Sequence, residues 1–404
     1  MTETQAIIDS YQRARAEGVR AALATVVRLE GSAYRRPGAR MFITETGETT
    51  GIISGGCLER DVCGRASKVI ETGEAIVVKY DTTSDDDIVW GMGIGCNGVV
   101  HVLIEPASDD RLDDLMRLLA ECSKVQRRGA VATVIDQEGE TDFPIGARAL
   151  LYPDDGSEPI PFISGVVIGP GIFDDLSDAV QSCASTIKRY EMDGTTVEVV
   201  IEVIDPQVPL VIFGAGDDAL PVVALARTLG WHTTVVDTRA RATSLERFAE
   251  ADAVLLCRPE EVSVRVPLTQ NPVVVMMTHN YLHDLELLKT LLNRSLRYLG
   301  VLGPKRRTQR LAVELSGGTA GSDEYVSQLH APAGLDIGAE TPGEIALSII
   351  AEIKAVLTQR EGGLLRNRNG SIHTEKSEPA LDTAWQVTVG SATRLSQLVM
   401  RQAG

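Results

Sequence analysis

The residues that most constrain the fold are a strand, a glycine-rich turn and a helix that follow one another from residue 209. An apolar strand at 209–213 leads into Gly214 and Gly216, and a helix is expected over 219–229. The next apolar strand ends at Asp237, about 20 residues further on. This order predicts a Rossmann-like, doubly wound parallel sheet. Further apolar segments predict its remaining strands, at 253–257, 272–277 and 298–302.

The sequence leaves several possible ligands for this sheet. The glycines and Asp237 are typical of NAD(P) sites, in which the acid accepts hydrogen bonds from a ribose. Two acids at the helix start, Asp217 and Asp218, would repel a pyrophosphate, so a phosphate-bearing pterin or no ligand are also considered. His279 follows a strand, at the edge where such sheets bind ligands. The basic loop 303–307, with Lys305 and Arg306, also follows a strand and is a candidate phosphate site.

The first two hundred residues contain one unit twice, at about 20–103 and 129–205. Three segments recur at the same spacing: Ala24-Thr25-Val26, Glu30-Gly31 and Gly38-Ala39-Arg40 correspond to Ala132-Thr133-Val134, Glu138-Gly139 and Gly146-Ala147-Arg148. Each copy has the pattern of a strand, a turn and a second strand. We therefore expect a duplicated α+β domain over 1–205, the Rossmann-like domain over 206–360, and a mostly flexible tail over 361–404.

The two copies differ where the first has Cys57 and Glu59 and the second has Val167 and Gly169. If the fold needed this cysteine and glutamate, the second copy would need them too, so their presence indicates a functional site. Cys57 follows a loop of small residues, Ser54, Gly55 and Gly56, whose exposed backbone N–H groups allow close approach of a ligand.

A second glycine-rich loop contains Gly95 and Cys96, and the first copy's turn contains Arg35. We expect Cys57 and Cys96 to act together and Arg35 to contact a ligand. His279 and His283 have the spacing of zinc ligands on a helix, but the glutamate of that motif is replaced by Asn280, which argues against a metal site there.

Composition excludes several classes of function. The 404 residues carry a formal charge of −17, which disfavours a nucleic-acid partner. No run approaches the roughly 18 apolar residues that cross a bilayer, so no membrane association is expected. The N-terminus lacks the pattern of a secretory signal and the six cysteines do not form a disulfide framework, which together predict a cytoplasmic protein.

Taken together, the motifs resemble those of the XdhC/CoxI family, the accessory proteins of molybdenum hydroxylases, over about residues 5–373. The matching segments are Gly31-Ser32 with Arg35 and Gly38, Ser54 to Glu59, Gly91-Met92-Gly93 to Cys96-Asn97-Gly98, Gly214-Ala215-Gly216, Thr278-His279 with Asp284, Gly300 to Arg307, and Gly334 to Pro342.

The resemblance implies a chaperone, rather than an enzyme in the turnover sense, that holds the molybdenum cofactor (molybdopterin) during sulfuration. It would then deliver the cofactor to an apo-molybdenum hydroxylase of the xanthine or carbon monoxide dehydrogenase type. A cysteine desulfurase is an expected partner, and a homodimer the expected assembly. Cys57 and Cys96 would contact the molybdenum, the dithiolene or the transferred sulfur, because a thiolate is a soft ligand and a sulfur carrier.

On the same reading, Glu59 would orient Cys57 or accept a proton, and Arg35, Lys305 and Arg306 would contact the cofactor's phosphate. Two alternatives remain open. One is an NAD(P)-dependent oxidoreductase or a thiol enzyme that uses Cys57 as its nucleophile, although no Tyr-x-x-x-Lys pair accompanies the glycine turn. The other is an assembly scaffold whose Rossmann-like domain binds no ligand.

Overall fold

The computed structural model forms two units, an N-terminal unit (Ala6–Asp205) and a C-terminal unit (Pro206–Ile372, together with the first five residues). Gly95, Cys96 and the tail from residue 370 lie outside the described residues. In the part that is described, no helix is both long and apolar enough to span a bilayer. The described residues are 2–31, 34–81, 98–107, 110–139, 144–153, 161–164, 171–192, 195–239, 241, 243–268, 271–317 and 326–369.

The N-terminal unit contains two antiparallel five-stranded sheets with the same connectivity. The first has the order β3-β2-β1-β5-β4 and the second the order β8-β7-β6-β10-β9. The strands of the first sheet are β1 (Ala21–Gly31), β2 (Arg40–Thr44), β3 (Thr49–Gly51), β4 (Ile76–Asp81) and β5 (Gly98–Pro106). Those of the second are β6 (Gly129–Glu138), β7 (Arg148–Leu151), β8 (Pro161–Ser164), β9 (Thr186–Met192) and β10 (Thr195–Ile204).

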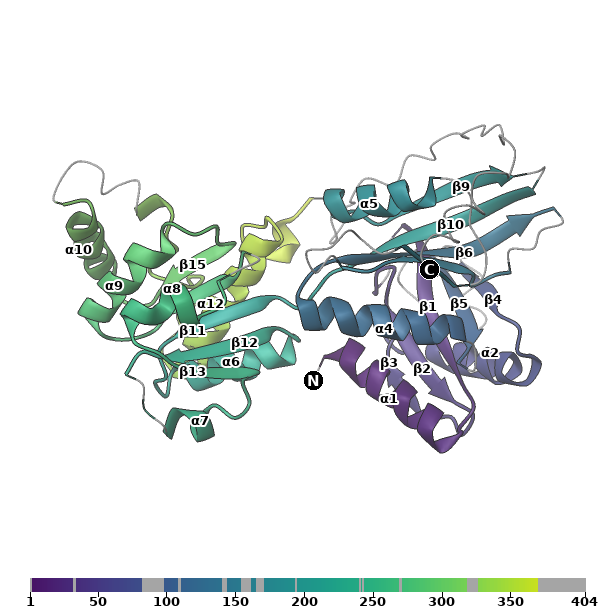
Figure 1. Cartoon of the computed structure of the whole chain (residues 1–404), viewed down its shortest axis with the longest axis horizontal. Coiled ribbons are helices and arrows are strands. Elements are labelled where there is room, and N and C mark those ends of the chain that lie inside the picture. The colour runs from purple at the N-terminus through teal and green to yellow at the C-terminus, as the bar shows by residue number, and fades with distance from the viewer. Residues whose placement is uncertain are drawn as a thin grey trace, which may run out of the picture. The chain divides into compact units, whose positions relative to one another are not determined.

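One helix covers the outer face of each sheet: α2 (Glu59–Thr72) the first and α5 (Ile172–Ser182) the second. Because side chains alternate between the faces of a strand, each sheet also has an inner apolar face, and these two faces meet. Their contact is a buried cluster of Val27, Leu103, Ile135 and Val200. Helices α1 (Glu3–Glu17) and α4 (Asp110–Val125) complete this core (Figure 1).

The C-terminal unit is a parallel sheet of order β13-β12-β11-β14-β15 between two layers of helices, which confirms the predicted Rossmann-like fold (Figure 1). Its strands are β11 (Pro209–Phe213), β12 (His232–Asp237), β13 (Ala253–Leu256), β14 (Val273–Met276) and β15 (Tyr298–Val301). One face is covered by α6 (Ala219–Thr228) and α12 (Pro342–Leu357). The other is covered by α8 (Val262–Arg265), α9 (Tyr281–Leu291) and α10 (Lys305–Leu315). The shorter helices are α7 (Thr243–Arg247), η1 (Pro259–Glu261) and η2 (Leu365–Asn367).

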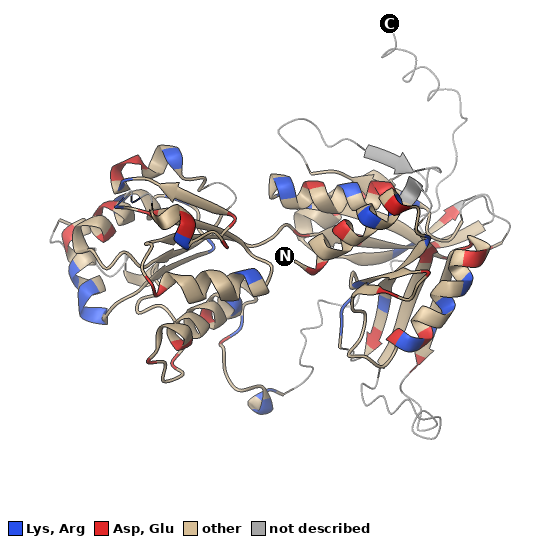
Figure 2. Cartoon of the chain, turned by 90° about the horizontal axis from the view of Figure 1, so that it is seen from below, with Lys and Arg blue, Asp and Glu red and all other residues tan. Residues whose placement is uncertain are grey.

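The expectation of a basic loop over 303–307 is wrong in its second half, because Lys305 and Arg306 form the first turn of α10. Pro304 precedes this helix in an extended conformation, and Leu311 anchors it in the core. The two cations therefore lie at a helix N-terminus, where the helix dipole opposes positive charge. Figure 2 shows Lys and Arg interspersed with Asp and Glu on the helices of both units.

Candidate functional site

The loop from Ser54 to Glu59 is closed by a ring of hydrogen bonds. The Ser54 hydroxyl donates to the Glu59 carboxylate, and the Ser54 backbone N–H donates to the same carboxylate at 2.8 Å. The Ser54 hydroxyl oxygen in turn accepts hydrogen bonds from the backbone N–H groups of Gly56 and Leu58, both at 3.2 Å. These bonds pair the backbone N–H groups of Ser54, Gly56 and Leu58, all in the loop that leads into α2. Ser54 and Glu59 thus fix the path of the chain around Cys57.

Cys57 lies at the centre of this loop, half-buried against the core of the first sheet. Its thiol donates to the Ser54 hydroxyl oxygen at 3.4 Å. Gly56 has a backbone φ of +105°, a conformation that favours glycine. A Cβ at Gly55 would lie 3.6 Å from the ring of Tyr34, so the turn that contains Arg35 lies beside the cysteine loop. The structure therefore places the turn that contains Arg35 next to the glycines and Cys57, and the roles of these residues stay predictions.

Hydrogen bonding sets the charge state of Glu59. Its burial opposes ionisation, but the hydrogen bonds from the Ser54 hydroxyl and backbone N–H outweigh this effect and lower the pKa of Glu59 below its ordinary value. The carboxylate is therefore ionised at neutral pH. Glu59 reaches Cys57 only through Ser54, which makes it a positioning residue for the thiol in this structure.

In the C-terminal unit, the residues predicted to bind a nucleotide lie at the carboxyl edge of the parallel sheet. Gly214 follows β11 with a φ of +127°, and a Cβ there would lie 2.3 Å from the carbonyl oxygen of Met277, which follows β14. Only glycine allows this close approach. Because β11 and β14 are neighbours whose following helices cover opposite faces, this is the point where the strand order reverses and where such sheets bind ligands.

Asp218 and His279 interact across this edge, with 2.6 Å between a carboxylate oxygen of Asp218 and Nε2 of His279. A Cβ at Gly216 would lie 2.4 Å from a carboxylate oxygen of Asp218, so the Asp218 side chain lies over the glycine turn. His279 has a φ of +53°, which is uncommon for a residue other than glycine and typical of functional or strained positions. An anionic group at the turn would have to displace the Asp218 carboxylate.

Asp237 is buried and its carboxylate is already hydrogen-bonded. It accepts from the backbone N–H groups of Arg239 and Arg241, from the Arg241 side chain, and from the Ser244 hydroxyl at 2.6 Å. Burial opposes its ionisation, but these hydrogen bonds lower the pKa of Asp237 overall. A carboxylate has about four acceptor positions. A ribose hydroxyl would therefore have to replace a protein donor at Asp237.

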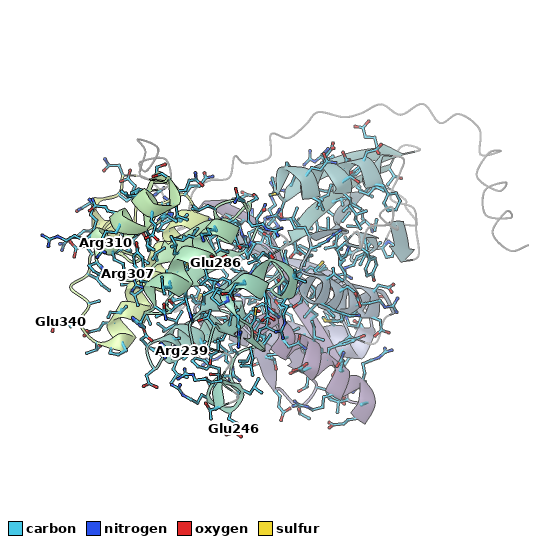
Figure 3. The ribbon with its side chains drawn as sticks, turned by 60° about the vertical axis from the view of Figure 1, so that its left-hand side comes forward. Arg239, Glu246, Glu286, Arg307, Arg310 and Glu340 are labelled. Atoms are coloured by element: carbon cyan, nitrogen blue, oxygen red, sulfur yellow. The ribbon has the colours of Figure 1, made fainter. Side chains whose placement is uncertain are left out.

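The cations near the same edge divide into two groups. The Arg307 guanidinium pairs at 2.5 Å with Asp284, whose carboxylate also accepts from Thr278, and so has a structural partner. Figure 3 labels Arg307 and Arg310, both on α10. Lys305 and Arg306 are exposed, and their role with a phosphate remains a prediction. Within the described ranges, no three His, Cys, Asp or Glu side chains gather as a metal site.

Arg60 and Lys68, for which the sequence predicted no role, line an open pocket on α2 together with Cys57. The signal was present in the spacing: Arg60, Gly64 and Lys68 are each four residues apart, which places them on one face of a helix that begins just after Cys57. The comparison of the two copies ends at Glu59, before this helical spacing becomes visible.

Comparisons with known proteins agree with this architecture. The sequence matches the XdhC and CoxI family over residues 14–81 and the XdhC Rossmann domain over residues 210–353. It is 34% identical to a protein of Bacillus subtilis described as a probable subunit of xanthine dehydrogenase, covering 82% of this chain and 92% of that protein. It is 24% identical to the molybdenum cofactor insertion chaperone PaoD of Escherichia coli, covering 85% and 86%. A crystal structure described as a xanthine dehydrogenase from Bacillus halodurans is 30% identical, with a TM-score of 0.68, and covers 88% of this chain and 97% of that one.

Proposed function

Because the chain belongs to the XdhC and CoxI family, we propose that it is an accessory protein that binds the molybdenum cofactor as cargo and delivers it to an apo-molybdenum hydroxylase. The names of two relatives support this role, since one is a probable subunit of xanthine dehydrogenase and the other a cofactor insertion chaperone. The client would be of the xanthine or carbon monoxide dehydrogenase type.

The observation that carries the proposal is the half-buried thiol of Cys57, fixed by Ser54 and Glu59 at the start of α2. A soft sulfur ligand suits molybdenum or a sulfur atom in transfer better than it suits an oxygen-binding metal. The thiol is accessible enough to touch a ligand, while its loop is held by several hydrogen bonds. Such a site can bind cargo without reorganising.

We further propose that the cofactor stays on the protein during sulfuration, with a cysteine desulfurase as the partner that supplies the sulfur. Glu59 would hold Cys57 in place through Ser54, and Cys96 would be the second sulfur contact. The turn that contains Arg35 lies beside the Cys57 loop, and Arg35 is a candidate for binding an anionic part of the cofactor. A homodimer is the proposed assembly.

No specific observation favours an NAD(P)-dependent oxidoreductase. The acid that would bind the ribose, Asp237, is engaged by Ser244 and the following backbone, and Asp218 lies over the glycine turn. NAD(P) therefore remains only the general expectation of a Rossmann-like sheet.

The test is to purify the protein anaerobically from a molybdate-fed host and to measure bound molybdenum and released pterin. We expect near-stoichiometric pterin in the wild type and a strong loss in Cys57→Ala. Cys63→Ala is the matched control, because Cys63 is also a half-buried thiol and lies in α2, the helix that follows the Cys57 loop. Equal pterin in Cys57→Ala and wild type would contradict a role for this thiol, and a wild type without pterin that binds NAD(P) tightly would contradict the function.

A further inference from the structure

One face of α2 carries charged side chains to which the proposed function assigns no role. Val62, Ala66 and Val69 point into the core, whereas the opposite face is exposed and continues the line of Cys57. An open pocket of about 710 Å³ lies on this face. Its lining includes Cys57, Arg60, Asp61, Gly64, Arg65 and Lys68. The pocket therefore extends from the candidate thiol along two turns of the helix.

The pocket carries an excess of positive charge. Asp61 is neutralised within it, since it pairs with Arg65 at 2.6 Å and also accepts a hydrogen bond from the Tyr80 hydroxyl at 2.7 Å. Arg60 and Lys68 are exposed and form no ion pair with any residue that the structure describes. In a chain of formal charge −17, two uncompensated cations beside one thiol indicate an anionic ligand.

Gly64 forms the floor between these cations. A Cβ at this position would meet no other atom within 4 Å, so the glycine is not required for packing. Arg60 and Lys68 lie one turn before and one turn after it, about 6 Å away along the helix axis in each direction. Both long side chains can therefore reach an anion placed over Gly64, and the missing side chain lets that anion approach the helix closely.

We propose that this pocket binds the phosphate monoester end of the molybdenum cofactor, with Arg60 and Lys68 as the phosphate-binding residues and the sulfur-rich end at Cys57. The inference rests on the proposed function and assigns the cofactor's orientation. A phosphate monoester carries a charge of about −1.5 to −2 at neutral pH, which the two cations balance. Cys57 immediately precedes α2 and lines the same pocket as Gly64 and Lys68, so one elongated ligand can contact both ends of the pocket.

The test compares the wild type with the double variant Arg60→Gln/Lys68→Gln. The control is Arg117→Gln/Lys124→Gln, which removes the same charge from exposed positions on α4. Affinities are measured anaerobically for the phosphate-bearing pterin and for the same pterin after phosphatase treatment. We expect the double variant to lose about tenfold per cation for the phosphate-bearing form only. The control should bind both forms as the wild type does.

The outcomes separate this assignment from the proposed function. A wild type that binds no pterin contradicts the proposed function and with it the orientation. A wild type that binds both pterins equally well overturns only the phosphate assignment. A double variant that keeps its affinity but no longer activates the hydroxylase also overturns it, and would identify this face as a protein docking surface. Unchanged thermal unfolding of each variant excludes misfolding as the cause.

Discussion

The Arg148 guanidinium donates two hydrogen bonds, at 2.7 and 2.5 Å, to the Glu105 carboxylate across the interface of the two sheets. Arg40, which occupies the position of Arg148 in the first copy of the repeat, pairs at 2.5 Å with Glu202 of the second copy. Each ion pair thus takes its arginine from one half and its glutamate from the other. This is the reciprocal pattern of a two-fold interface.

We expect Arg148→Met to lower the free energy of unfolding of the N-terminal unit by about 3–5 kcal/mol, because it leaves the Glu105 carboxylate buried without a cation. Arg40→Met should cost less, since the Glu202 side chain is 17% exposed and that of Glu105 only 6%. Urea denaturation followed by circular dichroism measures both. Equal losses would show that burial of the glutamate does not determine the cost.

The pKa of Glu59 gives a prediction about pH. Because folding lowers this pKa below its ordinary value near 4.5, the ionised carboxylate stabilises the fold above that pH, and the stabilisation is lost as pH falls through the folded pKa. Glu59→Gln should therefore be less stable than wild type at pH 7, and the difference should shrink towards pH 3. Thermal unfolding over this range tests it.

The control for that series is Glu71→Gln, near the opposite end of α2, where the glutamate is exposed and has no hydrogen-bond partner among the described residues. Its difference from wild type should stay small at every pH. A Glu59→Gln difference that is constant with pH would show that the charge of Glu59 does not contribute.

Gly64→Ala should have opposite effects on stability and on binding. An alanine in a helix interior is favoured over glycine by about 0.5–1 kcal/mol, and here its methyl group meets no other atom within 4 Å. The same methyl group would cover the floor of the pocket and weaken binding of the phosphate-bearing pterin. Thermal unfolding and pterin affinity, measured on one preparation, test both effects. A parallel change in the two would contradict the role given to Gly64.

Asp237→Asn separates structural from dinucleotide-binding roles of this acid. Because its carboxylate accepts hydrogen bonds from Ser244 and from the backbone of Arg239 and Arg241, we expect the variant to lower the stability of the C-terminal unit by about 1–3 kcal/mol. Added NADH should leave the melting temperatures of both the wild type and Asp237→Asn unchanged. An increase in the wild type that is absent from Asp237→Asn would instead establish a dinucleotide site.

Local patterns made much of the fold predictable. The strand, glycine turn and helix from residue 209 indicated the parallel sheet, because these signals lie within a few residues of one another. The start of α12 also has a local signature: Thr341 caps the helix, Pro342 is its first residue, and the Glu344 carboxylate accepts a hydrogen bond from the Thr341 backbone N–H at 2.8 Å. The start of α10 was missed, because Lys305 and Arg306 have neither a capping side chain nor an apolar period in the first turn.

The candidate site was predictable only in part. The loop around Cys57 was found because its repeat partner lacks the cysteine, which is a comparison within the sequence itself. The hydrogen bond between Ser54 and Glu59 requires the path of the loop, which spacing alone does not give. Arg40 and Arg148 each pair with a glutamate of the other half, which depends on how the two sheets face each other. Contacts between residues so far apart along the chain leave no local pattern in the sequence.

The reciprocal ion pairs also indicate how one half of the N-terminal unit could pair with an identical copy of itself. By the equivalence of the two copies, Arg40 of one such half would find Glu105 on a second, identical half. The N-terminal unit therefore has the arrangement of a homodimer whose two halves are joined in one chain. Joining the halves in one chain removes the requirement that both be the same, so the first copy can carry the thiol and the basic helix face while the second supplies the complementary surface.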